Sequence, residues 1–103
     1  MPGLQVVFHR LAADEYSSAR KWYAERSHVA DAHFRDAVDA AVERVTTCHE
    51  ALPRIGRLYR WVRVRGFPYI LITRAQSAER VMIVAVAHTS RRPGYWRQRR
   101  WEQ

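Results

Sequence analysis

The chain has 103 residues, 48% of them hydrophobic and 27% charged, with a formal net charge of +8. This length and composition predict one globular domain over residues 1–103, with a single modest core. No apolar run approaches the roughly 18–20 residues of a membrane-spanning helix, and no basic segment followed by an apolar stretch marks a signal peptide. Because the single cysteine, Cys48, cannot form an intramolecular disulfide, we expect a cytoplasmic protein with no membrane partner.

The first elements are a short strand and a helix. The apolar run Gln5–His9 predicts the strand. From about residue 12 to residue 26, apolar side chains recur at helical spacing, and they include Tyr16, Ala19 and Tyr23. Asp14 and Glu15 are expected in the first turn, where the helix dipole favours negative charge. Trp22 falls off this apolar stripe and is expected to cover a sheet edge or to meet a partner.

A second, longer helix is expected from about residue 29 to residue 50. Its apolar side chains step at threes and fours, and the predicted core positions are Phe34, Ala37, Val38, Ala41, Val45 and Cys48. Pro53 and Gly56 then end the helix and mark a loop. Two amphipathic helices joined by the short turn at 26–28 form a helical hairpin.

After Gly56 the hydrophobic period changes from 3.6 to 2. Alternation over residues 58–65 predicts a strand whose solvated face carries Tyr59, Trp61, Arg63 and Arg65. Two more strands are expected at about residues 69–74 and 79–88. The last of these is apolar on both faces, which predicts a central strand that is covered at least in part on both sides.

The predicted order is therefore β-α-α-β-β-β. Three consecutive strands on short connections form an antiparallel meander, the helical hairpin covers one face, and the N-terminal strand joins an edge. This is a two-layer α+β fold. A basic, aromatic tail follows at about residues 89–103, and the sequence leaves its secondary structure open.

Positive charge is concentrated in the second half of the chain. Residues 1–50 carry six basic and eight acidic groups, a balance of −2, whereas residues 51–103 carry twelve arginines and two glutamates, a balance of +10. A GC-rich genome can explain arginine in place of lysine, but it does not explain this asymmetry. We therefore expect the second half to face an acidic partner, either nucleic acid or an acidic protein.

Candidate site residues cluster after the last strand. Arginines can bind carboxylate or phosphate through two parallel hydrogen bonds, and aromatic rings offer stacking surfaces. The candidate binding residues are Arg91, Arg92, Tyr95, Trp96 and Arg97, with Arg63, Arg65 and His88 from the sheet. The alternative is a solvated basic tail with Trp96 packed on the sheet. No histidine or cysteine spacing fits a metal site, and no glycine-rich phosphate loop is present, so we expect neither a metal nor a cofactor.

Four short motifs together resemble the RelE/ParE superfamily, the toxins of bacterial type II toxin–antitoxin systems. They are Trp22-Tyr23, Leu52-Pro53 with Gly56, Phe67-Pro68-Tyr69-Ile70, and the run from His88 to Arg97. The last two look more like the ParE, or plasmid-stabilisation, branch. The resemblance implies growth arrest by the toxin and neutralisation by a cognate acidic antitoxin in a hetero-oligomer. ParE members are known for blocking DNA gyrase, whereas RelE members cleave mRNA on the ribosome.

The residues favour inhibition over catalysis. An RNA-cleaving site needs a base, an acid and cations around the phosphate, and His88, Arg91 and Tyr95 are the minimal set available. RelE-type ribonucleases usually carry lysines on the active face, and residues 51–103 contain no lysine. A strand-end cap is the interpretation that we favour for His88. We therefore predict a non-catalytic inhibitor of DNA gyrase or another replication target, with a ribosome-dependent mRNA endoribonuclease (mRNA interferase) as the alternative.

Overall fold

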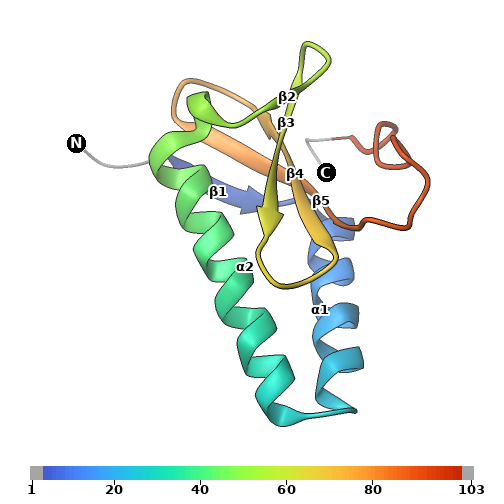
Figure 1. The fold of residues 1–103 in the computed structure, drawn as a ribbon. Helices are drawn as coiled ribbons and strands as arrows, with labels where there is room; N and C mark the ends of the chain where they lie inside the picture. Colours follow the sequence, from blue (N-terminus) through green and yellow to red (C-terminus); the bar gives the residue numbers. More distant parts are fainter. Residues whose placement is uncertain (1–3, 101–103) are drawn as a thin grey trace.

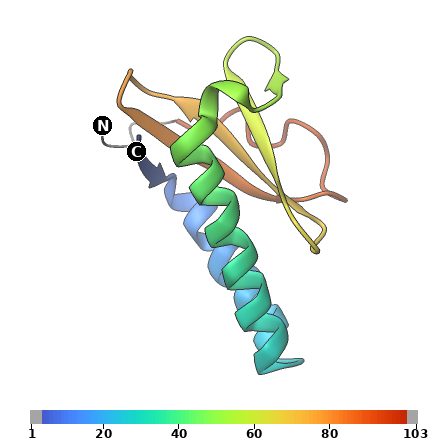
Figure 2. The same cartoon turned by 60° about the vertical axis from the view of Figure 1, so that its left-hand side comes forward.

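Two helices form a long hairpin that packs against one face of a mixed sheet in the computed structural model, which describes residues 4–100 (Figure 1). They are α1 (Arg10–Ala24) and α2 (His28–Cys48), and α2 continues into a 3-10 turn, η1 (His49–Ala51). The hairpin is longer than the sheet, so the connected end of the helices projects beyond it (Figure 2). Within residues 4–100, no helix is long and apolar enough to cross a membrane.

The sheet has five strands in the order β1-β5-β4-β3-β2. Their bounds are Gln5–Phe8 for β1, Arg54–Ile55 for β2, Tyr59–Val64 for β3, Tyr69–Ala75 for β4 and Arg80–His88 for β5. β1 pairs in parallel with β5, and every other pairing is antiparallel. The meander, the edge position of the N-terminal strand and the central position of β5 are confirmed. The two-residue strand β2 lies where the sequence predicts a loop.

The first helix begins earlier than its pattern predicts. His9 was expected at the end of the strand, but it is the residue before the helix, and its Nδ1 accepts a hydrogen bond from the Leu11 amide at 3.0 Å. Histidine is not among the usual N-cap residues, which is why the pattern placed the helix start later. The expectation that Asp14 and Glu15 occupy the first turn is therefore wrong, because the first turn holds no acidic residue.

One hydrophobic core lies between the helices and the sheet. Phe34, Val38, Ala41 and Val45 of α2 are buried there against the inner face of the sheet. Tyr16 and Tyr23 of α1 pack on the Phe34 ring, with ring centroids 6.0 and 5.0 Å away. These positions are core residues that the helical spacing predicts. The same spacing placed Cys48 in the core, and that prediction is wrong, because Cys48 is exposed at the end of α2.

A second core lies on the opposite face of the sheet. It contains Tyr59, Ile72, Met82, Val84, Ala85 and Ala87, and it is closed by Trp96 from the C-terminal segment. Residues 89–100 form successive turns, drawn in red in Figure 1, so this part of the tail is ordered over the sheet. Tyr59 is 8% exposed, so the prediction of a wholly solvated outer face on β3 is wrong at that position. Residues 101–103 of the predicted tail lie outside the described residues.

Candidate functional site

The candidate site lies at the edge of β5, along the part of this strand that continues beyond its pairing with β1. β1 ends at Phe8, and the last bond of this edge to the N-terminal segment runs from the His9 amide to the Ile83 carbonyl. Beyond it, side chains take the place of a strand: the Val84 carbonyl accepts from Arg99, and the Val86 amide donates to Glu15. Two side chains that are distant in the sequence thus provide hydrogen-bond partners for backbone groups at this edge, as buried backbone polar groups require.

Glu15 binds the C-terminal segment to this edge. Its carboxylate accepts from the Tyr95 hydroxyl at 2.7 Å, from the Arg99 guanidinium at 2.7 and 3.0 Å, and from the Val86 amide at 2.9 Å. Burial alone would raise the pKa of Glu15, but the hydrogen bonds from Arg99, Tyr95 and Val86 outweigh it and hold the pKa below the ordinary 4.5. Glu15 is therefore an ionised, partly buried carboxylate that joins α1, β5 and the C-terminal segment.

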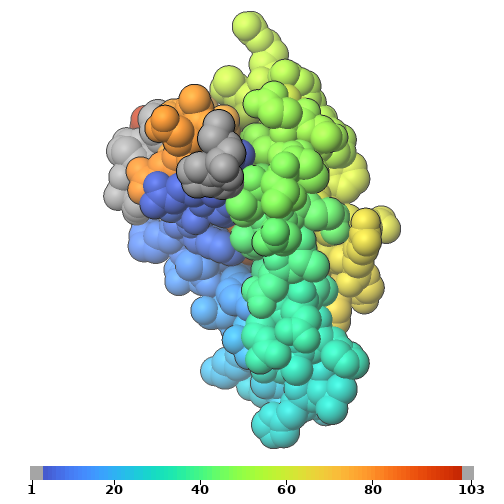
Figure 3. Space-filling view, turned by 90° about the vertical axis from the view of Figure 1, so that its left-hand side faces the viewer, coloured from blue at the N-terminus to red at the C-terminus, as the bar shows by residue number. Residues whose placement is uncertain are grey.

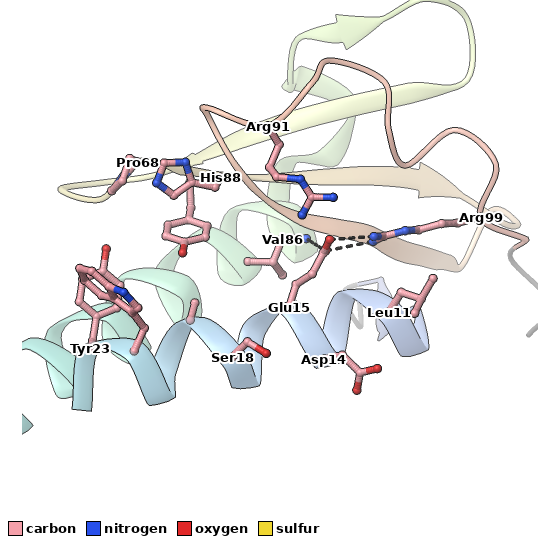
Figure 4. Close-up of a pocket in the computed structure, with 13 residues that line it drawn as sticks. Leu11, Asp14, Glu15, Ser18, Tyr23, Pro68, Val86, His88, Arg91 and Arg99 are labelled. Carbon is pink, nitrogen blue, oxygen red and sulfur yellow. Dashed lines mark hydrogen bonds and ion pairs between the residues drawn. The ribbon is translucent and has the colours of Figure 1, made fainter. Parts of the chain in front are cut away.

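A groove of about 660 Å³ opens beside this carboxylate, between α1 and the part of β5 that lies beyond β1 (Figure 4). Apolar side chains such as Val86 and Tyr69 line its inner part, and polar side chains lie along its rim. The rim and wall residues include Asp14, Ser18, Trp22, Tyr23, His88, Arg91 and Arg99. A groove with an apolar lining and polar side chains around it fits the apolar face of an amphipathic segment.

His88 lies at the end of β5, and its contacts are structural. Its Nδ1 accepts from the Ser90 amide at 3.0 Å and lies 2.7 Å from the Ser90 hydroxyl. Its ring meets the Tyr69 ring edge to face at 5.0 Å. Through these contacts His88 caps the strand end and fixes the turn that leads into the C-terminal segment.

Arg91 and Tyr95 lie together, and the hydroxyl of Tyr95 donates its hydrogen bond to Glu15. The Arg91 guanidinium lies over the Tyr95 ring, 3.9 Å from its centroid. Burial and the hydrogen bond to Glu15 raise the pKa of Tyr95 to about 12. A phenol with so high a pKa is a poor proton donor near neutral pH.

The remaining candidates fall at two ends of the sheet. Arg63 pairs with Ile70 near the end of β3, and Arg65 follows in the turn, so both lie toward the end of the sheet where His88 pairs with Tyr69. Arg92 is exposed in the C-terminal segment. At the opposite end of β3, Trp96 is 4% exposed and packs on Tyr59 with ring centroids 4.6 Å apart. The indole of Trp96 is thus part of the core and is not displayed for stacking on a partner.

Sequence reasoning missed two residues of the site, Glu15 from α1 and Arg99 from the C-terminal segment. Glu15 was assigned to the helix dipole, and Arg99 was counted only as part of the net charge. The two residues are 84 positions apart, so no local pattern links them. The position of Trp22 off the apolar stripe did indicate an exposed residue. Its side chain is 50% exposed, and the Arg26 guanidinium lies 3.6 Å from the centroid of its ring.

Comparisons with known proteins agree with this architecture. The family model described as "ParE toxin of type II toxin-antitoxin system, parDE" matches residues 6–93. A solved structure described as "Chromosomal ParDE TA system from P. aeruginosa" contains a chain similar in fold, with a TM-score of 0.66, 13% sequence identity, and coverage of 84% of this chain and 97% of that one. No curated protein sequence matches the chain. Because the family model spans most of the residues, this chain belongs to the ParE toxin family of type II toxin–antitoxin systems.

Proposed function

We propose that this ParE-family chain is a non-catalytic toxin that inhibits DNA gyrase or another replication target and is neutralised by a cognate acidic antitoxin. The observation that supports this function best is the display of arginine at the His88 end of the sheet. Arg63, Arg91 and Arg92 are exposed there, and within residues 4–100 none of them pairs with a carboxylate. Exposed, unpaired arginines suit an acidic protein surface.

The groove between α1 and β5 is the proposed antitoxin site. Its apolar lining would bind the apolar face of an amphipathic segment, and carboxylates of that segment would face Arg91. Trp22 offers a half-exposed indole at the same groove, the kind of side chain that contributes strongly to interfaces. Binding there would bring the toxin and an acidic antitoxin together as a hetero-oligomer in the cytoplasm.

The ribonuclease alternative has less support from the geometry. His88 directs Nδ1 at Ser90, and the Tyr95 hydroxyl is held by Glu15. A proton acceptor and a proton donor are thus each engaged in internal bonds, and Arg91 is stacked on the ring of Tyr95. Chemistry at a phosphate through Nδ1 of His88 or the Tyr95 hydroxyl would require that group to leave its partner first.

A gyrase supercoiling assay with purified toxin tests the proposal. We expect inhibition that is relieved by the antitoxin encoded beside this chain. Arg91→Glu should weaken inhibition by about tenfold or more, because reversing one interfacial charge costs at least about 1.4 kcal/mol. Arg80→Glu is the matched control, since Arg80 is also exposed but lies at the other end of β5.

Supercoiling that continues at a stoichiometric excess of folded toxin would contradict gyrase as the target. A ribosome-dependent mRNA cleavage assay run in parallel would then reveal the alternative. Cleavage that is lost in His88→Ala and Tyr95→Phe would support an mRNA interferase. For the antitoxin, affinity should fall as salt is raised, because surface charges are screened; affinity independent of salt would contradict the electrostatic part.

A further inference from the structure

The β2–β3 hairpin projects from the body of the molecule. It turns through the three residues 56–58, and Figure 3 shows it standing above the helices and the rest of the sheet. Gly56 has φ +61°, a conformation that favours glycine, and this lets so short a connection reverse the chain. Arg57 and Leu58 follow it, both exposed, and Leu58 is 56% exposed although it is a large apolar residue.

The base of this hairpin is strongly basic. Arg54 donates from Nη1 to the Arg57 carbonyl at 3.3 Å, which stiffens the turn, and Arg60 donates to the Leu52 carbonyl at 2.7 Å. Glu50 lies nearby, but within residues 4–100 it forms no ion pair with Arg54, Arg57 or Arg60. Three arginines of the hairpin therefore stand together near one glutamate, and none of the ion pairs among the described residues involves them.

A fourth arginine comes from the C-terminal segment. Arg97 lies over the Trp96 ring at 4.8 Å and near the Tyr59 ring at 5.7 Å, so its guanidinium is held against aromatic surfaces. Its side chain also folds over Gly94, where an added Cβ would lie only 3.0 Å from Nε. Arg57, Leu58, Tyr59 and Arg97 enclose a hollow of about 410 Å³. Two arginines thus line one open hollow beside the projecting turn.

We infer that the β2–β3 hairpin is a DNA-contacting element that binds duplex DNA through its phosphates. A two-stranded ribbon fits a DNA groove, and arginines on either side of it match the phosphates that flank the groove. The exposed Leu58 at the turn is the kind of apolar side chain that DNA-bending proteins insert at base steps. An acidic protein could bind the arginines equally well, but acidic side chains alone do not explain the narrow projecting turn with the exposed Leu58 at its tip.

This inference rests on the proposed function for its setting, because an inhibitor of gyrase acts beside the DNA that gyrase holds. It adds a second contact at the end of β3 opposite to Arg63 and His88. The toxin would then touch the enzyme through one end of its sheet and DNA through the other.

Fluorescence anisotropy with a labelled duplex of about 20 base pairs, in the absence of gyrase, tests the inference. We expect binding at low salt that weakens as salt is raised. Arg57→Ala should lower the affinity several-fold and reduce the slope of log K against log salt by about 1, because one phosphate contact is lost. Leu58→Ser should lower the affinity and leave that slope unchanged.

Arg35→Ala is the matched control, since Arg35 is exposed on α2 and removes the same charge. Thermal unfolding followed by circular dichroism should show all three variants as stable as the unsubstituted chain. Absence of binding at low salt, equal losses for Arg57→Ala and Arg35→Ala, or equally tight binding of poly-glutamate would overturn the inference. The supercoiling assay reports on gyrase inhibition separately, so either proposal can fail while the other holds.

Discussion

The edge of β5 and the β2–β3 hairpin use arginine in opposite ways. At the edge, Arg99 is 11% exposed in its side chain and forms a bidentate pair with Glu15, whose side chain is 16% exposed. At the hairpin, Arg54 and Arg57 are exposed and no carboxylate within the described residues pairs with them. Both sets belong to the same basic half of the sequence. Net charge therefore overstates the surface available to a partner, because part of it holds the fold together.

The C-terminal segment supplies residues to both regions. Loss of its Trp96 side chain, which packs on the sheet, should have the largest effect on the free energy of unfolding. We predict that Trp96→Ala lowers the free energy of unfolding by about 4 kcal/mol, because it empties the place of a buried indole in the second core. Urea unfolding measures this. Trp22→Ala is the control, since Trp22 is half exposed, and its cost should stay below about 1 kcal/mol. Equal costs for the two variants would contradict the structural role given to Trp96.

Breaking the partly buried ion pair between Glu15 and Arg99 should have the next largest effect on the free energy of unfolding. Glu15→Ala leaves Arg99 without its partner, and the Val86 amide and the Tyr95 hydroxyl without their acceptor. We predict a loss of about 3 kcal/mol in the free energy of unfolding, the lower end of the range for a broken buried pair, because this pair is only partly buried, and a fall in Tm of more than about 10 °C. Glu43→Ala, an exposed glutamate on α2, should cost less than about 0.5 kcal/mol. A similar Tm for the two variants would argue against the edge as a stabilising node.

The same pair predicts a pH dependence. The pKa of Glu15 in the folded chain lies below its ordinary value of 4.5, so the unfolded chain binds the proton more readily. The stabilisation is complete above about pH 4.5 and is lost as the pH falls further through the folded pKa. The difference in stability between the unsubstituted chain and Glu15→Gln should therefore narrow in acid. A gap that stays constant from about pH 7 to about pH 3 would contradict an ionised Glu15.

These two regions also separate what sequence can predict from what it cannot. The helices and long strands follow from repeating apolar positions such as Phe34, Val38 and Val45, because burial of one face requires that period. β2 has only two residues, too few to show any period. The Glu15–Arg99 pair depends on a fold that closes 84 positions of chain, so it is a property of the tertiary structure alone. The burial of Trp96 could not be predicted for the same reason. A basic, aromatic tail has the same composition whether it is solvated or packed on the sheet.

The smallest predicted effect bears on the choice between binding and catalysis. His88→Ala removes the acceptor for the Ser90 amide at the end of β5, and we expect a loss of about 1 kcal/mol, as for other local caps. Under the proposed non-catalytic inhibition, growth arrest on expression without antitoxin should persist, because inhibition by binding does not require the imidazole as a base. His88→Asn is the companion variant, since its side-chain oxygen can accept the Ser90 hydrogen bond and should recover most of the stability. If both variants are stable but neither arrests growth, the ring itself is needed, and the ribonuclease alternative becomes the better account of this end of the sheet.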